Sequence, residues 1–169
     1  MSAKLFTFSL IIFFLFNSST LAQQTPVDKI VTDLYQSISF SEDKEPDYEK
    51  FKSLFAGGAQ LVSVRDTVSY RLTPADYEKM MTKQRESGQL LSFTEKELHR
   101  TSEQYGNILH VFSTYKTHAQ TPNETDIERG INSIQLIKQD GEWKVTSIVW
   151  YQESREYPIP KKYLPDNEK

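Results

Sequence analysis

Four long strand-like runs fill the second half of the chain, after a first half in which the apolar residues follow helical spacing. The runs cover residues 91–101, 107–118, 128–139 and 142–153, and they are rich in β-branched and aromatic residues. Helices that precede a set of consecutive strands favour an α+β fold, with the helices on one side of an antiparallel sheet. We therefore expect one α+β domain built around this sheet.

The first helix is predicted by a start signal and by an apolar stripe. Thr25 can cap the helix, Pro26 suits its first turn, and Asp28 occupies its third position. Apolar residues then recur at spacings of three and four, at Val27, Ile30, Val31, Leu34, Tyr35 and Ile38. A stripe of this width indicates a helix that packs against another element.

Further helices and short strands are predicted before the long runs. A helix over residues 48–55 should end at the glycine pair 57–58, and residues 59–65 and 68–72 have the composition of short strands. The order Thr-Pro-Ala-Asp at 73–76 repeats the start signal of the first helix, so a third helix should begin there.

The turn of the last hairpin is predicted at Asp140-Gly141, a strong two-residue hairpin signal. A two-residue loop at this point places Tyr151 opposite Gly130, where the ring could shield the glycine backbone. Trp150 then lies on the other face of the sheet. Since both faces carry apolar residues, we expect both faces to be covered.

The first 22 residues have the order of a secretory signal peptide. A short basic start is followed by an apolar stretch over residues 5–16 and by a zone of small and polar residues that ends at Ala22. The apolar stretch is shorter than the roughly 20 residues that a membrane-spanning helix needs. We therefore expect cleavage after Ala22, no membrane anchor after cleavage, and a secreted or periplasmic protein.

Composition excludes several classes of protein. The sequence has no cysteine, so an exported domain must fold without disulfides and without thiol chemistry. Its net charge of -3 gives no electrostatic case for binding nucleic acid. Residues 23–153 have the length of one domain. Residues 154–169 are charged, hold three prolines and are expected to form a C-terminal tail.

Three stretches in the second half resemble a known superfamily. Residues 106–115 are similar to a middle strand, and residues 129–136 and 140–153 to the final hairpin, of the nuclear transport factor 2-like (SnoaL-like, cystatin-like cone) superfamily. The resemblance covers most of residues 25–153. It implies a strongly curved antiparallel sheet wrapped around the long N-terminal helix, with a cavity at the open end, and dimers through the outer sheet face. It does not fix an activity, because the superfamily holds several kinds of enzyme and many non-catalytic binders.

His99 and His110 are the candidate acid–base residues. If residues 103–106 form a four-residue loop, the two imidazoles become directly opposed on one sheet face, close enough to hold a ligand or relay a proton. A slip of one residue would separate them, and a structural or exposed role for both is the alternative. No third ligand accompanies them, so neither a metal nor a cofactor is expected.

Six other residues are candidates for ligand contacts. They are Tyr35, Tyr115, Asn132, Trp150, Tyr151 and Arg129. For Trp150 and Tyr151 the alternative is packing in the core or in an interface. For Arg129 it is an ion pair with Glu153 across the hairpin. Asp33 and Tyr35 lie near the place where the resemblance puts acid–base groups in catalytic relatives, but Asp33 falls off the apolar stripe and is expected to be solvated.

Three functions are consistent with these residues. The first is an exported, non-catalytic cone domain that binds a small apolar or amphipathic molecule or a protein partner, which suits the high aromatic content. The second is a metal-independent isomerase, dehydratase or hydrolase with His99 and His110 as its acid–base pair. The third is an interaction module whose cone is filled by its own side chains. A homodimer is expected in each case.

Overall fold

The structure is a computed structural model that describes residues 25–168, so the predicted signal peptide lies outside the described residues. Its helices are α1 (Pro26–Ile38), α2 (Tyr48–Ser53) and α3 (Pro74–Glu86). Its strands are β1 (Phe55–Arg65), β2 (Val68–Leu72), β3 (Ser92–Tyr105), β4 (Ile108–Gln120), β5 (Thr125–Gln139) and β6 (Glu142–Gln152). Two 3₁₀ turns, Lys161–Tyr163 and Asp166–Glu168, follow. None of the described helices is long and apolar enough to cross a membrane.

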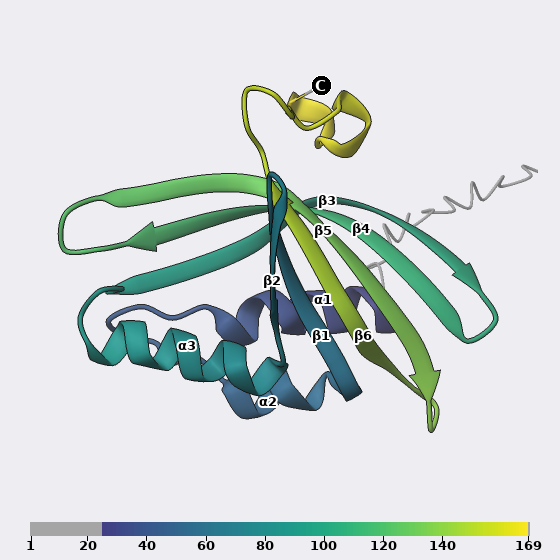
Figure 1. Ribbon diagram of the computed structural model, residues 1–169. Helices are drawn as coiled ribbons and strands as arrows, with labels where there is room; N and C mark the ends of the chain where they lie inside the picture. Colours follow the sequence, from purple (N-terminus) through teal and green to yellow (C-terminus); the bar gives the residue numbers. More distant parts are fainter. Residues whose placement is uncertain (1–24, 169) are drawn as a thin grey trace, which may run out of the picture.

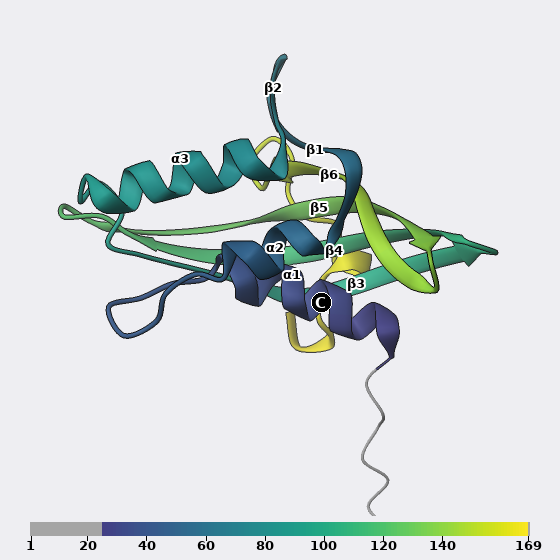
Figure 2. The ribbon, with the colours of Figure 1, turned by 90° about the horizontal axis from the view of Figure 1, so that it is seen from below.

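The strands form one curved sheet in the order β2-β1-β6-β5-β4-β3. All neighbouring strands pair in antiparallel fashion except β1 and β6, which are parallel. The three helices lie on the concave side of this sheet (Figures 1 and 2). The predicted α+β class and the antiparallel pairing of the last four strands are therefore confirmed.

Helices α1 and α3 begin where their start signals predict. The Thr25 hydroxyl accepts from the Asp28 backbone N–H at 3.1 Å, and the Asp28 carboxylate accepts from the Thr25 backbone N–H at 2.9 Å. Thr73 and Asp76 make the same pair of bonds at the start of α3. Two backbone donors at each helix start are thereby satisfied, which fixes the first residue of each helix.

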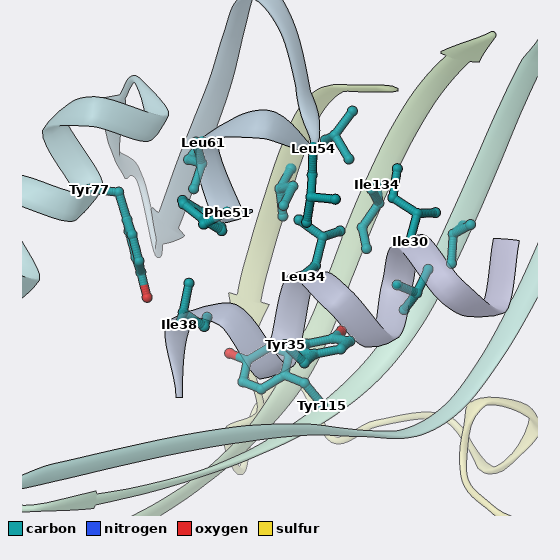
Figure 3. Packing of buried hydrophobic residues seen from close by; sticks show 14 of the residues in the cluster. Ile30, Leu34, Tyr35, Ile38, Phe51, Leu54, Leu61, Tyr77, Tyr115 and Ile134 are labelled. Carbon is teal, nitrogen blue, oxygen red and sulfur yellow. The ribbon is translucent and has the colours of Figure 1, made fainter. Parts of the chain in front are cut away.

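The apolar stripe of α1 packs into the hollow of the sheet. Val31 is fully buried there, and Leu34 is only 4% exposed. Figure 3 shows how side chains from α1 and α2 meet those of β1, β4 and β5. The largest fully buried side chains include Phe40, Phe51 and Ile134. The helix is thus held by its stripe, as its spacing predicts.

The glycine pair at 57–58 was predicted to end a helix, but the structure places it inside β1. Helix α2 ends at Ser53, and the pairing of β1 with β6 shifts register between Phe55 and Gln60. Gly58 has a φ of 80°, a conformation that favours glycine. The pair therefore allows the irregularity in β1. The prediction failed because glycine is common both at helix ends and in β-bulges, so its presence does not distinguish them.

The last hairpin turns at Asp140-Gly141 as predicted, but its register changes further along. Near the turn Leu136 lies opposite Val145, whereas Gln135 lies opposite Ser147. Thr146 is the extra residue of this bulge, and its hydroxyl donates to the Gln135 carbonyl at 3.1 Å. Every later residue of β6 is consequently displaced by one position relative to the prediction.

The bulge changes the neighbours of the two aromatic residues of β6. Tyr151 lies opposite Ile131, so the prediction that Tyr151 covers Gly130 is wrong. The ring over Gly130 belongs to Tyr115, the residue opposite it on β4. A Cβ atom on Gly130 would clash with the Tyr115 hydroxyl oxygen and with the Tyr151 backbone carbonyl, which leaves no room for a side chain. Trp150 and Tyr151 do lie on opposite faces, as alternation requires.

The segment after β6 folds back over the convex, outer face of the sheet (Figure 1). The Thr114 hydroxyl donates to the Tyr163 carbonyl at 2.6 Å, and the rings of Phe112 and Tyr163 lie 4.8 Å apart. Ile159 and Leu164 are each 8% exposed. The C-terminal segment thus covers part of the face opposite the helices.

Candidate functional site

A cavity of about 310 Å³ lies between the concave face of the sheet and the three helices. Its walls are mainly apolar, with Leu34, Ile38, Phe51, Phe93, Ile148 and Trp150 among the lining side chains. Its polar lining consists of Tyr35, Arg65, Tyr77, Glu95, Tyr115, Thr117, Asp126, Glu128 and Asn132. The cavity therefore combines an apolar interior with a limited set of polar groups.

A chain of hydrogen bonds crosses the floor of the cavity. Asn132 Nδ2 donates to Glu95 Oε1 at 3.0 Å and to Tyr35 Oη at 3.1 Å. The Tyr35 hydroxyl also bonds to Ser113 Oγ at 2.8 Å. Ser113 Oγ in turn donates to Glu97 Oε1 at 2.6 Å. Side chains from α1, β3, β4 and β5 thus meet in one polar network inside an apolar core.

The direction of each bond follows from the number of hydrogens available. A serine hydroxyl has one hydrogen, so Ser113, which donates to Glu97, must accept the hydrogen of Tyr35. Both amide hydrogens of Asn132 are also used. Within residues 25–168, Asn132 forms the single hydrogen bond to the side chain of Glu95. The second carboxyl oxygen of Glu95 therefore remains free for a ligand.

Glu95 lies deep in the protein, yet its side chain keeps some accessible surface because it faces the cavity. Its backbone N–H donates to Ser39 Oγ at 3.0 Å, and Ser39 Oγ donates to the Tyr35 carbonyl at 2.7 Å. The end of α1 thus fixes the position of Glu95. Burial raises the pKa of its carboxyl to about 7, and the Asn132 hydrogen bond opposes that rise. A carboxyl that ionises near neutral pH suits proton transfer.

Two tyrosine hydroxyls in the cavity have no hydrogen bond to any residue in the described part of the chain. They belong to Tyr77, which is 9% exposed, and Tyr115, which is 4% exposed. Figure 3 shows Tyr77 projecting from α3 toward the sheet. Burial, and then the negative charge of Glu95, raises the pKa of both hydroxyls. Both are therefore neutral groups that can donate to or accept from a bound molecule.

Four of the six predicted contact residues line this cavity: Tyr35, Tyr115, Asn132 and Trp150. Asn132 and Trp150 are directly opposed on β5 and β6, which is a result of the bulge at Thr146. Their contact with a ligand stays a prediction. The structure brings them to one place, with Glu95 beside them.

The other two predicted contact residues, Tyr151 and Arg129, lie on the outer face. Arg129 forms ion pairs with Glu153 at 2.9 Å and Glu168 at 2.7 Å, which confirms the ion-pair alternative. The ring of Tyr151 lies 5.5 Å from that of Tyr157 in the C-terminal segment. Neither side chain reaches the cavity.

The predicted opposition of His99 and His110 is wrong, because the hairpin between β3 and β4 has a two-residue turn at 106–107. His99 lies opposite Thr114, and His110 lies opposite Glu103. The bulge between Glu97 and His99 shifts only the part of β3 that precedes His99. Both imidazoles lie on the outer face, where His110 Nε2 and Ser133 Oγ are 3.0 Å apart. The structure therefore brings neither histidine to the cavity.

Sequence reasoning missed Glu95 and Tyr77, which are central to the cavity. Glu95 lies two residues after Phe93 in a run of alternating residues, so its side chain shares the face of that apolar ring. This alternation was the available signal. It could not be used without knowing which face of β3 meets the helices. Tyr77 is on the apolar side predicted for its helix, and nothing in the sequence separates a lining residue from a core residue.

Asp33 lies outside this cavity and forms ion pairs with Lys29 at 2.6 Å and Lys50 at 3.0 Å. These residues line a second cavity, of about 320 Å³, between α1, α2 and the β5–β6 turn. Asp33 is thus ion-paired at the periphery and not part of the polar floor. Among residues 25–168, no group of three or more His, Cys, Asp or Glu side chains could hold a metal ion.

Comparison with known proteins finds solved structures of the same fold but no close relative in sequence. The sequence matches no protein-family model and no curated protein. A scytalone dehydratase-like protein from Novosphingobium aromaticivorans is 13% identical, with a TM-score of 0.60 over 80% of this chain and 87% of that one. A ketosteroid isomerase-like protein from Shewanella frigidimarina is 16% identical, with a TM-score of 0.55 over 75% and 95%. A cystatin-like fold protein from Nostoc punctiforme is 9% identical, with a TM-score of 0.55 over 77% and 90%. Identities this low show a shared fold alone.

Proposed function

The chain has the cone fold of the nuclear transport factor 2-like and SnoaL-like proteins, and from this premise we propose that it binds a small, largely apolar molecule in its cavity. One observation carries the proposal: an open space of about 310 Å³ has apolar walls and a polar floor formed by Glu95, Asn132 and Tyr35. This make-up is typical of small-molecule sites. A cone filled by its own side chains would lack such a space, which counts against the interaction module.

A specific observation favours a second function, proton transfer of the isomerase or dehydratase kind. The Glu95 carboxyl faces the cavity with one oxygen free, and burial brings its pKa to about 7. As a base it would accept a proton from a carbon next to a carbonyl, and the Tyr115 hydroxyl would donate a hydrogen bond to the resulting oxyanion. Glu95 takes the role that the sequence assigned to His99 and His110. The names of two structural neighbours are in keeping with this chemistry.

Export and self-association complete the proposal. Residues 1–22 would be removed as a signal peptide, which yields a secreted or periplasmic protein that begins at Gln23. A homodimer would form through the outer sheet face, beside the C-terminal segment. Single apolar side chains are exposed on that face at Ile127 on β5 and Val149 on β6, where a second copy could cover them.

Native mass spectrometry of the protein purified from its own host tests all three parts. We expect a chain that begins at Gln23, a mass increment from a retained small molecule, and a dimer. The variant Ala119→Phe, which places a ring in the cavity, should lose the increment. Thr101→Phe, on the exposed outer face of β3, is the matched control and should retain it.

Each part has its own contradicting result. An increment that persists in Ala119→Phe would contradict binding in the cavity. A mature mass that includes residues 1–22 would contradict export by a cleaved signal. A monomer at micromolar concentration would contradict the dimer, and it would leave the cavity proposal intact.

A further inference from the structure

The charges that face the cavity are unbalanced. Glu95, Asp126 and Glu128 contribute carboxyl groups, and Arg65 contributes the only cation among the lining residues. Neither lysine nor histidine lines the cavity. In the described part of the chain, ten ion pairs join charged side chains outside the cavity, such as Arg129 with Glu153. Within residues 25–168, none of the three cavity carboxyls takes part in an ion pair.

The strand register places these carboxyls along one wall. Glu95 lies opposite Thr117, and Thr117 lies opposite Glu128, so the three residues form a row across β3, β4 and β5. Two strand spacings separate Glu95 from Glu128, a distance of roughly 10 Å between backbones. The adjacent row ends in Asp126, opposite Ala119. The small side chains of Thr117 and Ala119 on β4 thus leave space between the acidic side chains of β3 and those of β5.

The polar groups of the cavity that have no hydrogen-bond partner can act as acceptors, so they suit a ligand that donates hydrogen bonds. The hydrogens of Asn132 and Tyr35 are all used within the network, whereas one oxygen of Glu95 is free. The hydroxyls of Tyr77 and Tyr115 open onto the cavity, have no hydrogen bond in the described chain and can accept one from a ligand. The two side chains are only 9% and 4% exposed, and neither hydroxyl has a protein partner, which points to an occupant independently of the carboxyls.

We infer that the cavity selects an apolar molecule that carries a positively charged amine and rejects carboxylates. The amine would lie between Glu95 and Glu128, where it neutralises two carboxyls and donates to the free oxygen of Glu95. The aromatic faces of Tyr115 and Trp150 are further partners for a cation. An anion of the same shape would meet three carboxyls and a single cation, Arg65. This inference names the class of molecule and rests on the proposed binding function.

Three probes of the same shape test the charge preference: 2-phenylethylamine, 2-phenylethanol and phenylacetate. Isothermal titration calorimetry at pH 8 should rank the amine tightest, by about tenfold over the alcohol, with the carboxylate weakest. Glu128→Gln keeps the shape of the wall and removes one charge, so it should reduce amine affinity severalfold and leave alcohol affinity unchanged. Glu103→Gln, on the exposed outer face, is the control and should change neither affinity.

Chemical-shift perturbations in ¹H–¹⁵N spectra show where the probes bind. They thereby separate the charge preference from the proposed binding function on which it rests. Equal affinities for amine and alcohol, with perturbations at Thr117 and Asn132, would overturn the charge preference and leave the binding function standing. Tighter binding of phenylacetate would also overturn it. If none of the three probes perturbs the cavity residues, both the preference and its premise are contradicted. A Glu128→Gln variant that binds the amine as tightly as the unchanged protein would contradict the assigned position of the charge.

Discussion

Replacing Glu95 with glutamine is expected to stabilise the protein at pH 8 by about 3 kcal/mol. The pKa of the Glu95 carboxyl is about 7 in the folded protein, above its ordinary value of 4.5, because burial disfavours the charged form. Below pH 4.5 the carboxyl is protonated in both the folded and the unfolded state, so its burial does not lower the free energy of unfolding. Between the two values only the unfolded chain loses the proton, so stability falls as pH rises and reaches its lower level above pH 7.

Glutamine removes that loss while keeping an oxygen that can accept from Asn132. The gain should therefore be largest at pH 8 and mostly absent at pH 5. The carboxyl is surrounded by Asn132 on β5 and by three tyrosines that respond to its charge, Tyr35, Tyr77 and Tyr115; the substitution leaves all of them in place.

Urea denaturation of both proteins at pH 5 and pH 8 measures this difference. Glu103→Gln is the control, since Glu103 is exposed on the outer face and its loss should alter stability by no more than about 0.5 kcal/mol. A Glu95→Gln variant that is less stable than the unchanged protein at both pH values would contradict the account. Such a result would mean that the charged form of Glu95 is favoured by the fold.

Phe51→Ala is expected to destabilise the protein by about 3–5 kcal/mol. The Phe51 ring is 2% exposed and lies 4.8 Å from Phe55 and 5.3 Å from Tyr77, so it joins α2 to β1 and α3. Its removal takes away buried apolar surface and leaves a void next to the existing cavity. Since the Phe51 ring also lines the cavity, its truncation should enlarge the site.

Urea denaturation of Phe51→Ala beside Tyr105→Ala checks this prediction. Tyr105 is 84% exposed, so its truncation should change the free energy of unfolding by about 0.5 kcal/mol or less. Equal effects of the two truncations would show that Phe51 does not hold the helices on the sheet. A retained ligand should also dissociate faster from Phe51→Ala, because one wall of its site is lost.

The architecture could be predicted because its signals are local and repeated. The capping box at Thr25, the stripe of α1 and the turn at 140–141 each depend on a few neighbouring residues. They give the order of the helices and strands and the class of the fold. Most helix and strand ends therefore lie within a few residues of the expected positions.

The candidate site could be predicted only in part, because it depends on strand register. One extra residue at Thr146 moves Trp150 to the cavity face, and a short turn at 106–107 separates His99 from His110. Neither event has a sequence signal as clear as a hairpin glycine. Glu95 was missed for a related reason. An acidic residue in a strand is usually solvated, and only the three-dimensional packing shows that this one faces an apolar cavity.

The polar floor also illustrates a conflict between stability and function. A buried carboxyl that ionises near neutral pH lowers the stability of the fold, and an apolar side chain at the same position would not. The hydroxyls of Tyr77 and Tyr115 open onto the same cavity without a partner in the described chain. Together with the free oxygen of Glu95, these two hydroxyls are best understood as contacts held ready for a ligand.

Titration of the Glu95 side-chain carboxyl by ¹³C NMR tests the central claim most directly, with Glu95→Gln to assign the resonance. The account predicts a midpoint near pH 7, and a shift of that midpoint when 2-phenylethylamine is added. A midpoint near 4.5 that the amine leaves unchanged would show that Glu95 is solvated like a surface carboxylate, and the proposed site would fall with it.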